Sequence, residues 1–241
     1  MKSYTIFAGV YDDFMWDIPY GEWKKKVINA FDTLNISCNR VLELGCGTGN
    51  FTFELENAGY NVTGTDLSES MIKQAVKKKK RNHYTSEFHI MDMRKISSGS
   101  AYDSVVCVCD GMNYLVTGSE LLDTMKSAYG CLKWGGAFIF DMKTPAFYRQ
   151  LADNVYTDEI DRGSYIWEND YDENTGNNDY YLTFYLKKCF GLYKKYTEEH
   201  TQHAFTKEEI EEAAITAGFK IKTISENDFT QDRVFYVLGK E

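Results

Sequence analysis

Apolar residues in the first 143 positions follow two spacings, one typical of helix faces and one typical of buried strands. From Tyr20 to Leu34 they recur every three or four residues, which predicts an amphipathic helix with Pro19 at its start. Short apolar runs predict five strands, at residues 40–45, 60–66, 86–92, 103–110 and 137–143. Further helices are expected at residues 50–58, 69–81 and 119–133, with Gly59, a Ser68 cap and Gly135–Gly136 as boundary signals.

The order of these elements predicts the kind of sheet they form. Helices of 9–15 residues lie between strands, and a connection of this length is what a parallel crossover requires. The run at 103–110, DSVVCVCD, is apolar on both faces, as expected of a central parallel strand. We therefore expect a doubly wound α/β sheet with right-handed crossovers.

The pattern changes after residue 143. Residues 164–205 are rich in Tyr, Phe and Thr and alternate in short runs, with turn signals at 173–178 (ENTGNN) and at Phe190-Gly191. This predicts a small antiparallel sheet inserted after the fifth strand. Thr206 and Glu209 then form a capping box for a helix that ends at Gly218. Two last apolar runs, 219–225 and 232–240, are too close for a crossover helix and should pair as a hairpin.

These elements predict three parts. Residues 1–36 form cap helices, residues 37–150 and 206–241 form the α/β core, and residues 151–205 form the inserted sheet. The insertion is expected to be either a substrate lid or a dimer surface, so the protein is expected to be a monomer or a homodimer.

Composition excludes some classes of protein. The 36 acids and 27 bases give a net charge of -9, which argues against a nonspecific nucleic-acid binder. The cations at 77–81 lie at a helix end, where they suit the dipole, so we interpret them as a solvated end rather than an RNA contact. No apolar run is long enough to span a membrane, and the N-terminus lacks a secretory apolar segment. None of the six cysteines forms a C-x-x-C pair, so we expect reduced thiols in a cytoplasmic protein and no metal site.

The strongest chemical signal is the glycine-rich turn after the first strand, Leu44-Gly45-Cys46-Gly47-Thr48-Gly49. Glycine lets a ligand lie against bare backbone, and the helix that follows presents free N–H groups. Asp66 lies 21 residues after Gly45 at the end of the second strand, where a carboxylate can accept both ribose hydroxyls. With Asp92 ending the third strand at the same sheet edge, an adenosine-containing cofactor is expected.

A nicotinamide or flavin dehydrogenase is the simplest alternative. Its G-x-G-x-x-G/A fingerprint requires a small residue at position 50, which is Asn50 in this chain. This favours a cofactor without a pyrophosphate. The G-x-x-x-x-G-K-[ST] motif of P-loop kinases is absent from the sequence.

Four stretches resemble the successive motifs of class I S-adenosylmethionine-dependent methyltransferases: VLELGCGTGNFT (41–52), VTGTDLSESMIKQA (62–75), FHIMDMRKI (88–96) and YDSVVCVCDGMNYL (102–115). LKWGG (132–136) is similar to the family's L-K-P-G-G turn, with Trp134 in place of Pro. The N-terminal VYDDFMWDIPYGEW and the inserted segment resemble a bacterial small-molecule subgroup similar to the aminosugar N-methyltransferases. The resemblance implies a seven-stranded Rossmann-like sheet whose last strand is antiparallel.

The resemblance also implies which residues hold S-adenosylmethionine, from which S-adenosylhomocysteine is the product. Gly45, Gly47 and Gly49, with Cys46 among them, are implied to hold the methionine part, with its ammonium near the Gly45 carbonyl. Glu43 is implied to support this loop from behind.

The adenosine part is implied to lie against the next two strand ends. Asp66 is expected to bind the ribose hydroxyls, and Leu67 to pack on the adenine. Asp92 is expected to accept from the adenine amino group, and the Met93 N–H to meet a ring nitrogen.

The methyl group is implied to lie beside the end of the fourth strand, at Cys109 and Asp110. Tyr11 and Trp23 of the N-terminal segment are expected to help close the cofactor pocket.

Methyl transfer from a sulfonium is an in-line displacement, for which positioning supplies much of the acceleration. An amine acceptor must be neutral when it attacks, which requires a base or a site that lowers its pKa. The candidate catalytic residues are Asp110, Asn113, Tyr114, His200 and His203. Alternatively, Asp110 and Asn113 only fix the turn, and the two histidines are ordinary sheet residues.

Aromatic faces of Tyr148, Tyr165 and Trp167 could hold a cation, although such residues of an insertion are more often hairpin core. Asp110-Gly111-Met112-Asn113 differs from the N/D-P-P-Y/F loop used on planar amines of DNA bases and glutamine.

The sequence thus predicts a methyltransferase acting on a small polar molecule, with an amine as the first acceptor and a hydroxyl as the second. Two alternatives remain open: a methyltransferase acting on RNA or protein, and a non-catalytic S-adenosylmethionine-binding module.

Overall fold

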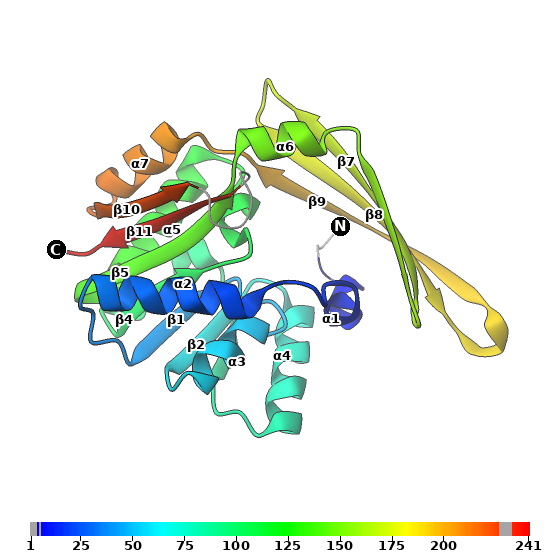
Figure 1. Ribbon diagram of the computed structural model, residues 1–241, viewed down its shortest axis with the longest axis horizontal. Coiled ribbons are helices and arrows are strands. Elements are labelled where there is room, and N and C mark those ends of the chain that lie inside the picture. The colour runs from blue at the N-terminus through cyan, green and yellow to red at the C-terminus, as the bar shows by residue number, and fades with distance from the viewer. Residues whose placement is uncertain (1–3, 5, 227–232) are drawn as a thin grey trace.

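The computed structural model describes Tyr4, residues 6–226 and residues 233–241. Its larger sheet has seven strands in the order β10-β11-β5-β4-β1-β2-β3 (Figure 1). The five parallel strands are β1 (Arg40–Leu44), β2 (Asn61–Asp66), β3 (Glu87–Ile90), β4 (Tyr102–Cys107) and β5 (Leu132–Lys143). β11 (Arg233–Gly239) is antiparallel both to β5 and to β10 (Lys220–Glu226). The predicted doubly wound sheet with an antiparallel last strand is confirmed.

Helices cover both faces of this sheet. α2 (Tyr20–Thr33) and α3 (Asn50–Asn57) contribute Val27, Phe31 and Leu55 to the core on one face. α5 (Gly118–Cys131) and α7 (Lys207–Thr216) contribute Met125 and Ala214 to the core on the other face. α4 (Glu69–Asn82) follows β2, and the Ser68 side chain accepts from the Met71 N–H at its start, as predicted.

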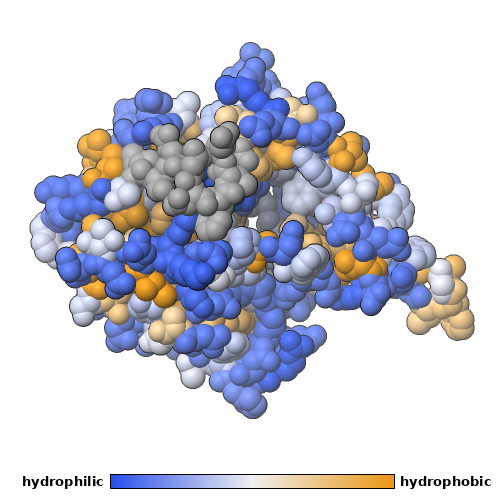
Figure 2. Space-filling view, in the orientation of Figure 1, coloured by the Kyte–Doolittle hydropathy of each residue, from blue (hydrophilic) through white to orange (hydrophobic). Residues whose placement is uncertain are grey.

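The second sheet is antiparallel and extends away from the core as a long twisted ribbon (Figure 1). Its strands, in order, are β6 (Val155–Ile160), β7 (Gly163–Asp172), β8 (Asn177–Lys187) and β9 (Tyr193–His203). The predicted hairpin turns lie between β7 and β8 and between β8 and β9, where Cys189–Gly191 form the short helix η4. Phe190 and Leu192 at the second turn are exposed, and apolar residues mark the projecting tip in Figure 2.

The N-terminal segment packs against the inserted sheet rather than against the core alone. It consists of η1 (Phe7–Gly9) and α1 (Tyr11–Phe14), and its Phe7 and Phe14 rings lie against Phe184 of β8. The buried carboxylate of Glu198 accepts hydrogen bonds from the backbone N–H groups of Tyr4, residue 6 and Phe7. Tyr4, Ile6 and Phe7 are therefore fastened to β9.

Several boundaries differ from the expected ones. The predicted helix 119–133 ends at Cys131 and leads directly into β5, so Gly135 and Gly136 lie within the strand. A Cβ at Gly136 would lie 2.7 Å from the Asp103 carbonyl oxygen, so close strand pairing explains this glycine. β4 ends at Cys107 rather than at Asp110, because Cys109 and Asp110 adopt left-handed φ angles of 63° and 53°.

The sequence also missed two elements between the sheets. α6 (Pro145–Leu151) is only seven residues long, although Thr144 accepts from the Phe147 N–H as its cap. β6 lies at the edge of the second sheet and is exposed along nearly all of its length, so it carries no alternating pattern. The capping box at Thr206 and Glu209 is present as predicted, and α7 ends at Thr216. In the described part of the chain, no helix is long and apolar enough to cross a membrane.

Asn113 joins the core to the inserted sheet. It lies in η3 (Gly111–Tyr114), after β4, and its side chain is fully buried. Its Nδ2 donates to the carbonyls of Lys143 and His203 at 3.2 and 2.9 Å, and its Oδ1 accepts from the Lys143 N–H at 2.9 Å. The ends of β5 and β9 are thereby held to the turn after β4.

We predict that Asn113→Ala lowers the free energy of unfolding by about 2 kcal/mol, because it leaves buried backbone groups of the two strands unpaired. Asn178→Ala is the matched control: Asn178 is also fully buried, but neither polar atom of its side chain has a hydrogen-bond partner among the described residues. Urea denaturation of the two variants compares them. Equal losses in both would contradict the joining role of Asn113.

Candidate functional site

A cavity of about 1030 Å³ opens at the carboxyl ends of β1 to β4. Ten residues that the sequence singles out for cofactor binding line it. They are Tyr11, Glu43, Gly45, Cys46, Gly47, Asp66, Leu67, Asp92, Met93 and Cys109. Open α/β sheets bind ligands at this edge.

Two further residues of that set lie elsewhere. Gly49 is the N-cap of α3, and a Cβ there would approach the Phe88 ring to 2.9 Å, so it permits close packing behind the loop. Trp23 lines a second cavity, where the Arg233 guanidinium lies 5.2 Å from its ring centre. Among the described residues, neither belongs to the lining of the larger cavity.

The glycine loop is held in place by Asp66. Gly47 has a left-handed φ of 53°, and its N–H donates to Asp66 Oδ2 at 2.9 Å, while the Ser68 N–H donates to Oδ1 at 2.7 Å. Burial raises the pKa of Asp66 against the lowering effect of these two bonds. The carboxylate thus joins the first and second strand ends, and each of its oxygens can accept a further hydrogen bond.

Near the ends of β2 and β3, the cavity is lined by apolar side chains and by an ion pair. Leu67 and Ile90 are 66% and 53% exposed although both line a concave surface, so they offer unburied apolar area to a flat ligand. Asp92 pairs with Arg94 at 2.7 Å, and this hydrogen-bonded pairing lowers the pKa of Asp92. Arg94 also pairs with Glu120, which fixes the third strand end to α5.

Glu43 lies beneath the loop and is 2% exposed. Burial raises its pKa to about 8, opposed by the hydrogen bond that its carboxylate accepts from the Thr52 hydroxyl. Glu43 also lines the larger cavity, and its supporting role stays a prediction.

A partly exposed ion pair that the sequence did not reveal ties the N-terminal segment to the loop. Lys78 Nζ lies 2.8 Å from Asp12 Oδ2 and also donates to Thr48 and Asn50, at 2.9 and 2.5 Å. Asp12 accepts from the same two side chains at 2.6 and 3.0 Å. The interpretation of the 77–81 cations as solvated is therefore wrong for Lys78, whose side chain is 15% exposed. Its signal was hidden within a run of five cations.

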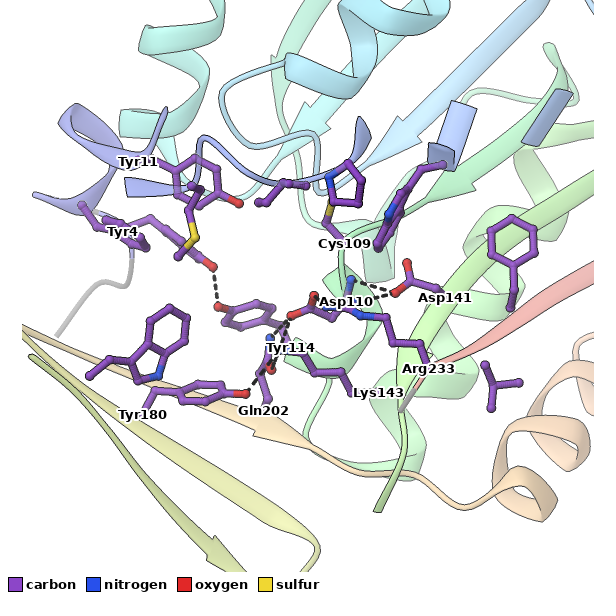
Figure 3. A pocket seen from close by; sticks show the side chains of 18 of the residues that line it. Tyr4, Tyr11, Cys109, Asp110, Tyr114, Asp141, Lys143, Tyr180, Gln202 and Arg233 are labelled. Atoms are coloured by element: carbon purple, nitrogen blue, oxygen red, sulfur yellow. Dashed lines mark hydrogen bonds and ion pairs between the residues drawn. The ribbon is translucent and has the colours of Figure 1, made fainter. Parts of the chain in front are cut away.

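The second cavity has a volume of about 360 Å³ and adjoins the first. Tyr4, Tyr11, Cys109 and Tyr114 line both cavities, and we call the place where the two cavities meet the passage. Figure 3 shows these four side chains around the second cavity. Its walls come from the N-terminal segment, α2, β5, β11 and the inserted sheet. They include Phe7, Trp23, Lys26, Asp110, Asp141, Lys143, Trp167, Tyr180, Gln202, Arg233 and Phe235.

Asp110 forms the centre of an ionic network on the wall of the second cavity (Figure 3). It pairs with Lys143 at 2.9 Å and with Arg233 at 2.8 Å, and Gln202 Nε2 donates to it at 2.9 Å. Burial opposes its ionisation, but Lys143 and Arg233 outweigh burial and hold the pKa of Asp110 well below its usual range. Asp110 is therefore a fixed anion, which organises the wall and is a poor proton acceptor.

The structure separates the other catalytic candidates. Tyr114 lies at the passage, with its hydroxyl hydrogen-bonded to that of Tyr4. His200 is buried behind it, with Nδ1 3.4 Å from the Tyr114 hydroxyl. His203 bonds to Asn177 at 2.7 Å and is absent from the described lining of both cavities. Asn113 is saturated by backbone groups, as described above.

Comparisons with known proteins agree with this geometry. A family model described as a methyltransferase domain matches residues 41–136. The protein named "Putative methyltransferase YqeM" of Bacillus subtilis (strain 168) is 32% identical over 246 residues, covering 98% of this chain and 97% of that one. This chain belongs to the methyltransferase family.

Solved structures extend the agreement to the whole fold. A S-adenosylmethionine-dependent methyltransferase from Clostridium acetobutylicum ATCC 824 is 26% identical to this methyltransferase, with a TM-score of 0.85 and 99% of each chain covered. The sugar N-methyltransferase KedS8 from Streptoalloteichus sp ATCC 53650 has the same fold at 19% identity, with a TM-score of 0.79 and coverage of 96% and 93%. The methyltransferase uses S-adenosylmethionine.

The larger cavity fits S-adenosylmethionine. Its glycine loop leaves backbone bare for the methionine part, Asp66 has lone pairs for the ribose hydroxyls, and Leu67 with Ile90 offers an apolar face for adenine. Tyr11 and Cys109 lie at the end that opens on the second cavity.

We predict that Asp66→Ala weakens S-adenosylmethionine binding about 10- to 100-fold, because a charged hydrogen-bond acceptor is lost and the loop is no longer held. Isothermal titration calorimetry measures the affinity. Asp123→Ala is the control, since Asp123 is exposed on α5 and is not part of the described lining of either cavity. Unchanged affinity in Asp66→Ala would refute the assignment of this carboxylate.

The raised pKa of Glu43 leads us to predict that the stability of the protein depends on pH. Because its pKa is raised in the folded state, to about 8, folding takes up a proton between about pH 4.5 and pH 8. Its contribution to stability is present below the unfolded pKa and is lost as pH rises to 8, by up to about 1.4 kcal/mol per pH unit. Urea unfolding from pH 5 to 8 should show a shallower decline in Glu43→Gln. Parallel curves for both proteins would contradict a neutral Glu43.

Proposed function

We propose that this methyltransferase transfers a methyl group to an amine of a small polar molecule. The observation that carries the proposal is the second cavity, which meets the cofactor cavity at Tyr4, Tyr11, Cys109 and Tyr114. An acceptor in the second cavity would face the end of the first at which the methyl group is expected. Its volume of about 360 Å³ is within the range of small-molecule sites.

The enclosure of this cavity supports a small acceptor over RNA or protein. The N-terminal segment covers it through Phe7 and Tyr11, and Glu198 fastens that segment to β9. A macromolecular acceptor would have to enter beneath these contacts. The net charge of -9 also disfavours RNA.

When bound, S-adenosylmethionine supplies a methyl group on a positively charged sulfur. The residues at the passage orient the acceptor for attack in line with the sulfur–carbon bond, which is the main source of acceleration in such a transfer. Tyr4 and Tyr114, joined through their hydroxyls, form part of the wall where the two cavities meet.

The lining of the second cavity suits a polar molecule with both donors and acceptors. Two buried polar atoms of this lining have no partner among the described residues, Asp141 Oδ1 and Trp167 Nε1. The first can accept from an N–H group and the second can donate to an oxygen. An amine carried on an oxygen-rich molecule satisfies both. The shared fold with the sugar N-methyltransferase KedS8 supports this class.

The inserted sheet serves as a wall of the acceptor site in this proposal. β7, β8 and β9 contribute Trp167, Tyr180 and Gln202 to the lining. This supports the lid rather than the dimer surface for residues 151–205, with residues 1–36 as a second cover and residues 37–150 and 206–241 as the core.

The test is transfer of a radiolabelled methyl group from S-adenosylmethionine to paired small acceptors, each pair consisting of an amino sugar and its hydroxyl analogue. We expect labelling of amino compounds and little labelling of their hydroxyl partners. Bulk RNA and a protein lysate serve as competing acceptors in parallel reactions. Labelling confined to hydroxyl compounds, RNA or protein would contradict the proposal.

A further inference from the structure

One carboxylate oxygen of a residue that lines the second cavity has no hydrogen-bond partner in the network around it. Asp141 lies in β5 and is 3% exposed. Its Oδ2 accepts from Arg233 Nη1 at 2.7 Å and from the Asp110 N–H at 3.3 Å. Its Oδ1 is buried and has no hydrogen-bond partner in the described part of the chain, and Figure 3 shows it directed away from both bonds.

The neighbouring carboxylate differs in this respect. Asp110 is held by Lys143, Arg233 and Gln202, which together occupy both of its oxygens. Two acids therefore share Arg233, but only Asp141 has a carboxylate oxygen without a hydrogen-bond partner among the described residues. Two neighbouring carboxylates whose environments give them different pKa values are typical of acid–base sites.

We propose that Asp141 is the general base that accepts a proton from the acceptor amine through Oδ1. This inference rests on the proposed function, since it requires an amine in the second cavity. Neither the sequence candidates nor the comparisons assign a role to Asp141.

The step balances as follows. An N–H bond of the bound ammonium breaks, its electron pair stays on nitrogen, and the proton moves to Asp141 Oδ1. The nitrogen lone pair then forms the bond to the methyl carbon, and the sulfur–carbon bond breaks with its electrons remaining on sulfur. The product is a methylated ammonium and a neutral thioether, and the Asp141 proton is released to solvent when the product leaves.

The charges around Asp141 support this role. Burial raises the pKa of Asp141 to about 6, opposed by Arg233 and reinforced by the anion of Asp110, so the group is ionised at pH 7 and titrates close to it. Nearby cations also disfavour a positive charge on the amine. The titratable and charged groups that interact with Asp141 are Arg233, Asp110, Cys107 and Cys109. Those that line the same cavity also include Lys26, Lys143, Tyr4, Tyr11, Tyr114 and Tyr180.

The other groups at the passage are poorer bases. Burial raises the pKa of Tyr4 and Tyr114 further above their usual values, so both stay neutral at pH 7. His200 lies behind Tyr114 and is absent from the described lining of the second cavity.

The experiment compares Asp141→Asn with Asp110→Asn, two substitutions of the same chemistry at adjacent acids. The first readout needs no turnover: infrared difference spectra of the free protein should show a carboxyl that titrates near pH 6 in wild type and in Asp110→Asn, shifted in the latter, but not in Asp141→Asn. Calorimetry with S-adenosylmethionine and thermal unfolding establish that each variant is folded.

The second readout is kcat at saturating amine as a function of pH. For the amino compound labelled most strongly by wild type, we expect kcat to fall below about pH 6 and Asp141→Asn to lower kcat at pH 7 about 100-fold or more, without that acidic limb. A fluorinated analogue of lower amine pKa should recover part of the loss in Asp141→Asn, because it needs less help in losing its proton. Asp110→Asn should not show this recovery.

Each possible result of these experiments supports or overturns the base role of Asp141. Turnover with an unchanged pH profile in Asp141→Asn, or the absence of a carboxyl that titrates near pH 6, overturns the base role while the proposed function stands. Wild-type protein that binds S-adenosylmethionine but labels no amine overturns the proposed function and the base role with it. Loss of S-adenosylmethionine binding in Asp141→Asn would assign Asp141 to structure instead.

Discussion

The architecture of the site depends on the ionised carboxylate of Asp110. It lies in a turn whose left-handed residues Cys109 and Asp110 would each cost about 1 kcal/mol or more if nothing held them. Salt bridges to Lys143 and Arg233 and a hydrogen bond from Gln202 stabilise this turn and join β4 to β5, β11 and β9. Removing one partner of such a buried network leaves an uncompensated charge, which is why its members act as a unit.

This network fixes the position of the turn at which the two cavities meet. Because the turn after β4 is fixed, Cys109 lies at the passage between the cofactor cavity and the second cavity, while the Asp110 side chain faces the second one. The N-terminal segment closes both cavities, held at one end by Glu198 and at the other by the pair of Asp12 and Lys78. The cofactor cavity and the second cavity therefore share one cover.

The features predicted best from the sequence are those formed by residues close together in the chain. The strand-turn-helix around Gly45 and the acids after β2 and β3 could be placed because parallel strands end at one sheet edge. The network of Asp141, Lys143 and Arg233 could not, since its members lie up to 123 residues apart from Asp110 and meet only through sheet pairing. An acid within the apolar run AFIFDMK was the one available signal for Asp141.

The alternation of side chains along β9 bears on the two histidines that the sequence offered as catalytic candidates. His200 and His203 are three residues apart on β9, an odd spacing that places their side chains on opposite faces of the strand, so they could not act together. The crystal structure of the complex with S-adenosylhomocysteine tests the central claim most directly. The account predicts ribose hydroxyls on Asp66 and the sulfur at the passage beside Tyr11 and Cys109, facing the second cavity. A sulfur directed away from that cavity, or a passage closed by the bound ligand, would contradict it.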